Sequence, residues 1–162
     1  MNNKHISIIA CISKNNALGK NNGLLYHLPN DMKLFKSLTT GNTVIMGSKT
    51  YYSFPKGALP NRENIVISRA DLDIADAKVC HTIQEAIDSA TNKEIFIIGG
   101  GQIYKQCLDI ADTMYLTIVD NIAEDADAFF PEWGNEWKKV EDSPREADEK
   151  HKYNYSFTIW KK

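Results

Sequence analysis

The sequence is poor in cysteine and has no long apolar run. Its three cysteines, Cys11, Cys80 and Cys107, are widely spaced and form no C-x-x-C pair, which argues against a disulfide framework and a zinc site. The four histidines show no metal-ligand spacing. The first ten residues lack the apolar stretch of a signal peptide, and no run reaches the roughly 18 apolar residues of a membrane span. We therefore expect a reduced, cytoplasmic protein without a metal.

The sequence also lacks an excess of charge of one sign. It has 19 Lys and Arg against 21 Asp and Glu, which gives a net charge of -2. A nucleic-acid or anionic-membrane partner would require a basic patch, so neither is expected. A small anionic ligand is not excluded, because it needs only a few cations. With 162 residues, 43% of them hydrophobic, the chain fits one globular domain spanning residues 1–162.

Short runs rich in Ile and Val predict buried strands. They are Ile6–Cys11, Thr43–Met46, Asn64–Ile67, Glu94–Ile98 and Met114–Val119. Helical patterns lie between them, at Pro29–Leu38, Thr82–Ala90 and Gly101–Leu108. This alternation is typical of an α/β fold with a mostly parallel, twisted central sheet and helices on both faces.

Two segments depart from the alternation. Trp137–Glu141 and Lys152–Trp160 alternate like strands with no helix between them, which predicts an antiparallel C-terminal edge. Ser13–Tyr26 is rich in Asn and Gly and shows neither a strand nor a helix pattern. It leaves the end of a predicted strand, where ligands bind in open α/β sheets. A lid over a site and a plain surface loop are the two interpretations.

Asp31 is a carboxylate on an apolar helix face. If Pro29 is the first helical residue, Asp31 shares that face with Leu34, Phe35 and Leu38. Asp is also favoured in a first helical turn by the helix dipole and the free N–H groups. A structural role would therefore account for it. The alternative is a buried acid that fixes a polar heterocycle beside an aromatic side chain.

Two glycine turns follow predicted strands. Gly99–Gly101 precedes a helix, where glycines let a phosphate approach the backbone. The dinucleotide fingerprint G-x-G-x-x-G is not met, because its sixth position is Tyr104. Gly47–Thr50 is not a P-loop, because Ser48 separates the glycine from the lysine. Either turn could hold a phosphate or simply begin a helix.

Three further side chains have ordinary explanations when taken alone. Arg62 precedes a predicted strand and Arg69 follows it, and such arginines are usually solvated surface charges. Thr117 lies in the middle of a predicted strand, where Thr is common.

Taken together, in order and spacing, these signals resemble the dihydrofolate reductase family along nearly the whole chain. The matching segments are Ile8–Cys11, Leu18-Gly19, Leu28–Asp31 with Phe35, Val44–Gly47 with Thr50, Leu59-Pro60 with Arg62, Ile98–Gly101 with Tyr104, Tyr115–Thr117 and Phe130-Pro131. The resemblance implies NADPH-dependent reduction of 7,8-dihydrofolate to 5,6,7,8-tetrahydrofolate, with hydride transfer to C6 and protonation at N5. It also implies a role in one-carbon metabolism, inhibition by antifolates and a monomeric state.

For the substrate, the resemblance implies that Asp31 accepts hydrogen bonds from the 2-amino group and N3–H of the pterin. Thr117 would orient Asp31, and Arg62 would bind the α-carboxylate of the glutamate tail, with Lys36 nearby. The implied walls of the substrate site are Ile9, Cys11, Met32, Phe35, Phe54, Leu59 and Ile98. The implied catalytic group is Asp31, Tyr26, Leu24 and Thr117. Asp31 is held at the far edge of the ring, so we expect a water to protonate N5.

For the cofactor, the resemblance implies that the two glycine turns hold the pyrophosphate of NADPH. The implied contacts are Cys11, Leu18, Gly19, Gly47, Ser48, Lys49, Thr50, Ser68, Arg69, Ile98, Gly99, Gly100, Gly101, Gln102, Ile103 and Tyr104. Leu18–Leu24 would form the lid over the nicotinamide, with Asp127 as its partner.

The chain departs from the usual family pattern at three places. Tyr26 stands where many bacterial members have Trp, although a phenol can also hold a water. Ser48 stands where an arginine often contacts the 2′-phosphate, so Lys49 and Arg69 are the candidates for that role, and we expect NADPH to be preferred over NADH. The segment near Asp127 is one residue longer than in common bacterial members.

Three other functions compete with this one. A related pterin or riboflavin-pathway reductase would keep the glycine turns and change the substrate wall, but Asp31 with Phe35 and Arg62 favours folate. A nucleotide-binding protein without redox chemistry could be built on Gly47–Thr50. A catalytically silent binding protein is the third alternative.

Overall fold

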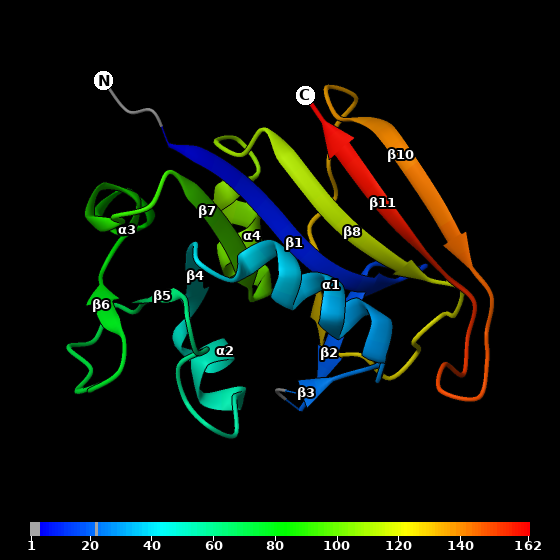
Figure 1. Cartoon of the computed structure of the whole chain (residues 1–162), viewed down its shortest axis with the longest axis horizontal. Helices are drawn as coiled ribbons and strands as arrows, with labels where there is room; N and C mark the ends of the chain where they lie inside the picture. The colour runs from blue at the N-terminus through cyan, green and yellow to red at the C-terminus, as the bar shows by residue number, and fades with distance from the viewer. Residues whose placement is uncertain (1–3, 22) are drawn as a thin grey trace.

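An eight-stranded sheet organises the chain (Figure 1). The computed structural model describes residues 4–21 and 23–162. The strands of this sheet are β1 His5–Ser13, β4 Thr43–Gly47, β5 Glu63–Ile67, β6 Lys78–Cys80, β7 Glu94–Gly99, β8 Thr113–Val119, β10 Lys138–Arg145 and β11 Tyr155–Lys161. They lie in the order β10-β11-β8-β1-β7-β4-β5-β6.

The pairing of these strands changes direction only at the C-terminal edge. Neighbours from β8 through β1, β7, β4 and β5 to β6 are parallel. β11 is antiparallel to β8, and β10 is antiparallel to β11. The predicted mostly parallel sheet with an antiparallel edge is confirmed.

Helices cover both faces of the sheet. They are α1 Pro29–Thr39, α2 Ser48–Ser53, α3 Ile83–Ser89 and α4 Gly101–Cys107. Val44 and Met46 pack with Phe35 of α1 and Tyr51 of α2, whereas Ile45 packs in a second cluster with α3 and α4. This division follows from the strand period of two, which points successive side chains to opposite faces. The predicted helices on both faces are confirmed.

The prediction that Ser13–Tyr26 contains no strand is wrong. β2 Ala17–Lys20 and β3 Gly23–Leu24 join β9 Ala128–Phe129 in a small second sheet, in the order β3-β2-β9. Asn22, part of the expected lid, lies outside the described residues. β2 pairs locally with β3 and, through Ala17, with the distant Phe129 of β9. Strands of two to four residues are too short to show an alternating pattern in the local sequence.

The C-terminal strands also differ at their ends from the prediction. β10 runs on to Arg145, and β11 begins at Tyr155 instead of Lys152. Residues 152–154 belong to the β10–β11 turn, which Asn154 closes by accepting the N–H of Ala147 at 2.7 Å. Within residues 4–21 and 23–162, no helix is long and apolar enough to span a membrane.

Candidate active site

Asp31 meets the carboxyl ends of two central strands. It lies in the first turn of α1, and its Oδ1 accepts a 2.5 Å hydrogen bond from Thr117 Oγ1 of β8. Cys11 of β1 is the register partner of Thr117 on the neighbouring strand. The structure thus gathers a carboxylate, a hydroxyl and a thiol at the edge of the sheet where open α/β folds bind ligands.

Burial sets the electrostatics at this point. It raises the pKa of Asp31, and the hydrogen bond from Thr117 partly opposes that rise. Burial also raises the pKa of the Cys11 thiol well above its usual range, and the charge of Asp31 adds to this effect. Cys11 is therefore a neutral wall at physiological pH, and Asp31 is the group that can accept hydrogen bonds from a polar ligand.

An apolar cluster lies beside Asp31 on the face covered by α1 and α2. Ile9 and Ile98 are buried in it, with Phe35, Phe54 and Leu59 packed against them. These five residues were all predicted to wall a ligand. Other predicted residues do not join the cluster: Leu24 and Met32 are 83% and 53% exposed, and Lys36 is exposed.

Arg62 lies close to the end of α1. Its Nε donates to the carbonyl oxygen of Pro60 at 2.9 Å, and its Nη1 donates to Thr39 Oγ1 at 3.1 Å. Burial lowers the pKa of the guanidinium. The group nevertheless stays positively charged at any physiological pH. These two hydrogen bonds fix the position of the guanidinium group and leave its other N–H donors for an anion.

The two glycine turns come together at the ends of β4 and β7. Met46 is paired with Gly99, and a Cβ at Gly47 would lie 3.2 Å from the side chain of Ile103. Gly99 has a φ of +129°, and a Cβ there would lie 3.3 Å from the Tyr104 hydroxyl and 3.4 Å from the Thr50 hydroxyl. Glycine is favoured at position 99 because any side chain would be strained at this φ, and the surrounding space is tight.

The same region has the backbone donors that an anion needs. α2 and α4 begin at this edge with Gly47 and Gly100 as their N-caps, and neither helix start has a side-chain cap. The first-turn N–H groups of a helix have no partner within the helix itself. Together with the close-packed glycines, these groups fit the pyrophosphate of a dinucleotide.

The other predicted cofactor residues border this edge. Ile67, at the end of β5, is paired with Gly47, which places Ser68 and Arg69 next to the turn. Lys49, Arg69 and Gln102 are exposed there. Tyr104 is buried and donates its hydroxyl to the carbonyl oxygen of Ile9 at 2.8 Å, which joins α4 to β1.

The predicted lid approaches the glycine turn. Leu18 of β2 lies 3.9 Å from where a Cβ of Gly101 would be. Asp127 holds the same segment by accepting the N–H of Asn21 at 2.9 Å and donating its own N–H to the carbonyl oxygen of Gly19 at 3.0 Å. The expected partnership of Asp127 with this segment is thus present, despite the longer neighbouring sequence.

Tyr26 is oriented by a residue that the sequence did not reveal. Its hydroxyl donates to Asn121 Oδ1 at 2.7 Å, and its ring packs edge-on against Tyr153 at 5.6 Å between centroids. Burial, then the neighbouring Tyr153 and Cys11, raise its pKa. Asn121 and Tyr153 are distant from Tyr26 in sequence and belong to no motif, so only the fold reveals them.

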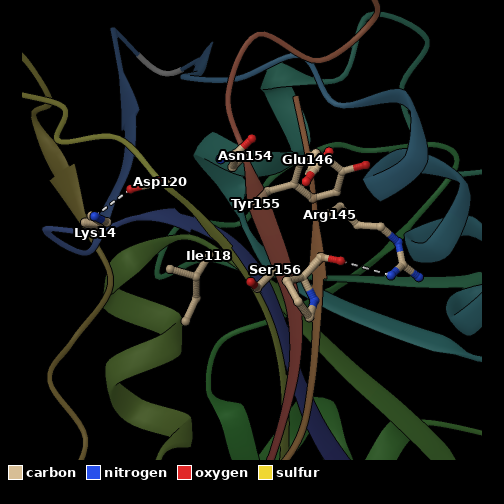
Figure 2. Close-up of a pocket in the computed structure, with 9 residues that line it drawn as sticks. Lys14, Ile118, Asp120, Arg145, Glu146, Asn154, Tyr155 and Ser156 are labelled. Atoms are coloured by element: carbon tan, nitrogen blue, oxygen red, sulfur yellow. Dashed lines mark hydrogen bonds and ion pairs between the residues drawn. The ribbon is translucent and has the colours of Figure 1, made fainter. Parts of the chain in front are cut away.

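A separate cavity of about 460 Å³ lies on the C-terminal side of the sheet (Figure 2). Lys14 and Asp120 form a 2.5 Å ion pair at its edge, and Arg145 and Tyr155 also line it. Neither Asp31 nor Thr117 lines it, and none of its lining residues was predicted to bind substrate or cofactor.

Comparisons with known proteins agree with this geometry. The family model for dihydrofolate reductase matches residues 5–162. The chain is 38% identical to the dihydrofolate reductase of Bacillus subtilis over 160 residues, which cover 97% of this chain and 94% of that protein. It is 42% identical to that of Buchnera aphidicola from Acyrthosiphon pisum over 158 residues, 96% and 98% of the two chains. A solved dihydrofolate reductase from Enterococcus faecalis, complexed with NADP(H) and RAB-propyl, has a TM-score of 0.89, 30% identity, and coverage of 97% and 95%.

Proposed function

The chain belongs to the dihydrofolate reductase family, and on that premise we propose which of its residues carry the reaction. It is an NADPH-dependent oxidoreductase that reduces 7,8-dihydrofolate to 5,6,7,8-tetrahydrofolate, and this reaction supplies one-carbon metabolism. The related pterin and riboflavin-pathway reductases are the less supported alternative.

The bond between Thr117 and Asp31 is the observation that carries the proposal. Asp31 binds the 2-amino group and N3–H of the pterin, a paired contact that suits two carboxylate oxygens. Thr117 fixes the plane of that carboxylate. The apolar cluster around Ile9, Phe35 and Ile98 holds the ring and excludes water from one side of it.

The glutamate tail lies toward Arg62 in this proposal. Its α-carboxylate accepts hydrogen bonds from the guanidinium N–H groups of Arg62 that do not bond to Pro60 or Thr39. Leu59 and Phe54, packed on the same cluster, cover the aminobenzoyl group.

NADPH supplies the hydride when bound. The residues that would hold its pyrophosphate are the two glycine turns, Gly47–Thr50 and Gly99–Gly101, with the starts of α2 and α4. Lys49 and Arg69 would contact the 2′-phosphate beside Ser68, because Ser48 cannot supply a charge. The binding of NADP(H) by the Enterococcus faecalis relative supports this assignment.

The proton for N5 comes from water in this proposal. Asp31 binds the edge of the pterin ring that lies away from N5. It holds the ring in place, and its negative charge tunes the ring electronically. The segment Leu18–Leu24, joined to Asp127, controls the access of that water. The Tyr26 hydroxyl donates to Asn121, and its oxygen can still accept a hydrogen bond from such a water.

We also propose that the protein is a cytoplasmic monomer that antifolates inhibit. Antifolates that mimic the pterin would use the same carboxylate, because they present paired N–H donors to it.

The decisive test is the loss of NADPH absorbance when purified protein is mixed with dihydrofolate. We expect turnover by the unmodified chain and a loss of at least about a hundredfold in Asp31→Asn at neutral pH, because the charge-assisted pair is removed. Asp125→Asn is the matched control, since Asp125 is 85% exposed. Turnover by Asp31→Asn at the unmodified rate at every pH would refute the role of Asp31. NADPH binding without oxidation by dihydrofolate would favour a riboflavin-pathway substrate.

A further inference from the structure

A buried histidine from the C-terminal hairpin contacts the start of the helix that carries Asp31. His151 lies in the turn between β10 and β11 and is only 2% exposed. Its Nε2 accepts the backbone N–H of Asn30 at 3.3 Å, across 121 residues of sequence. Asn30 immediately precedes Asp31, so this contact bears directly on the first turn of α1.

α1 has no cap of its own. Its N-cap residue, Leu28, makes no side-chain hydrogen bond to the helix, and Pro29 has no N–H. The N–H of Asn30 is therefore the first donor of the helix, and without a partner it would be left unsatisfied. His151 supplies from a distant strand turn the acceptor that Ser, Thr, Asp or Asn usually supplies locally.

A second contact holds the same turn of the helix. Asn30 Nδ2 donates to the Tyr155 hydroxyl at 3.0 Å. The His151 ring stacks on Tyr155, with centroids 5.0 Å apart and planes inclined by 28°. Both the backbone and the side chain of Asn30 are thus tied to the hairpin, while the next residue, Asp31, is tied to Thr117.

The contacts also determine which ring nitrogen carries the proton. A backbone N–H can only donate, so Nε2 must present its lone pair to Asn30. The proton is then on Nδ1, which lies 2.8 Å from Asp148 Oδ1, an obligatory acceptor. Asp148 is itself fixed, because its carboxylate also accepts the N–H of Lys150 at 2.9 Å and its backbone bonds reciprocally with His151. Only a neutral imidazole of this tautomer satisfies both neighbours.

We propose that His151 is a positioning residue for the reaction: its neutral imidazole caps α1 and thereby sets the direction in which Asp31 presents its carboxylate to the pterin. Asp148 acts behind it by fixing the tautomer. This inference rests on the proposed role of Asp31 in binding dihydrofolate.

A pair of variants separates the cap from simple packing. In His151→Gln, the side-chain carbonyl can reach the position of Nε2 and still accept from Asn30. In His151→Asn, the shorter amide reaches only the position of Nδ1 and leaves the helix uncapped. We expect His151→Asn to raise the Kd for dihydrofolate, measured by quenching of protein fluorescence, by about threefold to tenfold. His151→Gln should stay within about twofold of the unmodified chain, and the Kd for NADPH should be unchanged in both.

A double-mutant cycle tests whether His151 acts through Asp31. In the Asp31→Asn background, His151→Asn should leave the dihydrofolate Kd unchanged. A full additional effect in that background would overturn the proposal, and so would equal losses in the Gln and Asn variants or a parallel loss of NADPH affinity. The proposed function is judged separately, by whether Asp31→Asn alone weakens dihydrofolate binding.

If His151→Asn fails to fold while His151→Gln folds and binds normally, the cap is upheld as the required feature. If both fail to fold, the ring is a packing element and the proposal is wrong.

Discussion

Thr117 and Asp31 are 86 residues apart in the sequence, and a 2.5 Å hydrogen bond joins the hydroxyl of one to the carboxylate of the other. The bond opposes the effect of burial on the pKa of Asp31. It therefore favours the charged carboxylate, which is the form that would accept hydrogen bonds from the pterin in the role proposed for Asp31. One hydroxyl thus helps to orient the acid and favours its charged form against the larger effect of burial.

Replacing Thr117 by Val removes the hydroxyl and keeps the shape. We expect the dihydrofolate Kd to rise by about fivefold to tenfold, because a buried carboxylate loses a donor. The pKa of Asp31 should rise further, so the acid limb of the binding profile should move to higher pH. Thr158→Val is the control: Thr158 is equally buried and donates to the carbonyl oxygen of Leu116 at 2.6 Å, on the neighbouring strand. If both variants lose stability alike and neither changes Kd, Thr117 is only structural.

Asp31→Asn should make the ligand-free protein more stable at neutral pH. Burial raises the pKa of Asp31 above its ordinary value of 3.8, so the folded state binds more protons than the unfolded state in the window above pH 3.8. Stability therefore falls as pH rises through the folded pKa. Asn has no charge to bury and can still accept from Thr117. A gain of about 1 kcal/mol would raise Tm by about 2–4 °C, and the gain should vanish near pH 3. A lower Tm at pH 7 would show that the ionised acid stabilises the fold.

The sequence predicts the large elements of this fold well, for a physical reason. β4 and β7 contain the continuous apolar runs Val44–Met46 and Ile95–Ile98, and the burial of these runs is encoded locally. β2, β3 and β9 are not predictable in this way, because they are only two to four residues long and because β2 pairs on one side with the distant β9.

The same distinction applies to the site. Asp31 and Gly99–Gly101 are recognisable because their spacing lies within one helix or one turn. His151 and Asn121 are not, because their contacts with Asn30 and Tyr26 span 121 and 95 residues. No local pattern distinguishes a histidine that caps a remote helix from one that is solvated.

Asp127→Ala should loosen the lid without unfolding the protein. It removes the acceptor of the Asn21 N–H, a 2.9 Å bond at an exposed position. Leu18 of the same segment lies 3.9 Å from where a Cβ of Gly101 would be, so we expect the NADPH Kd to rise by about threefold to tenfold. Asp125→Ala should change it by less than about twofold, because that carboxylate is 85% exposed and 3.8 Å from Lys20. Equal effects of the two substitutions would argue against a specific bond by Asp127.

His5, at the start of β1 and at the other end of that strand from Cys11, makes the stability of the fold depend on pH. Its Nδ1 lies 2.9 Å from Glu94 Oε1, and its Nε2 contacts the Asp112 carboxylate. Burial alone would lower the pKa of His5, but the two carboxylates outweigh it and raise the pKa above 6.5. The folded state therefore binds the proton more tightly than the unfolded state does. This stabilisation is fully present below pH 6.5 and is lost as the pH rises through the folded pKa.

His5→Gln should remove that part of the pH dependence. We expect the free energy of unfolding to fall by at most about 1 kcal/mol at pH 6, because the groups are partly exposed, and to approach that of the unmodified chain at pH 9. Urea unfolding at both pH values measures the difference. In the Glu94→Gln/Asp112→Asn background the substitution should have no such dependence, because no carboxylate is left to hold the imidazolium. A difference that stays constant from pH 6 to pH 9, or that persists in this background, would show that His5 contributes through packing and not through its charge.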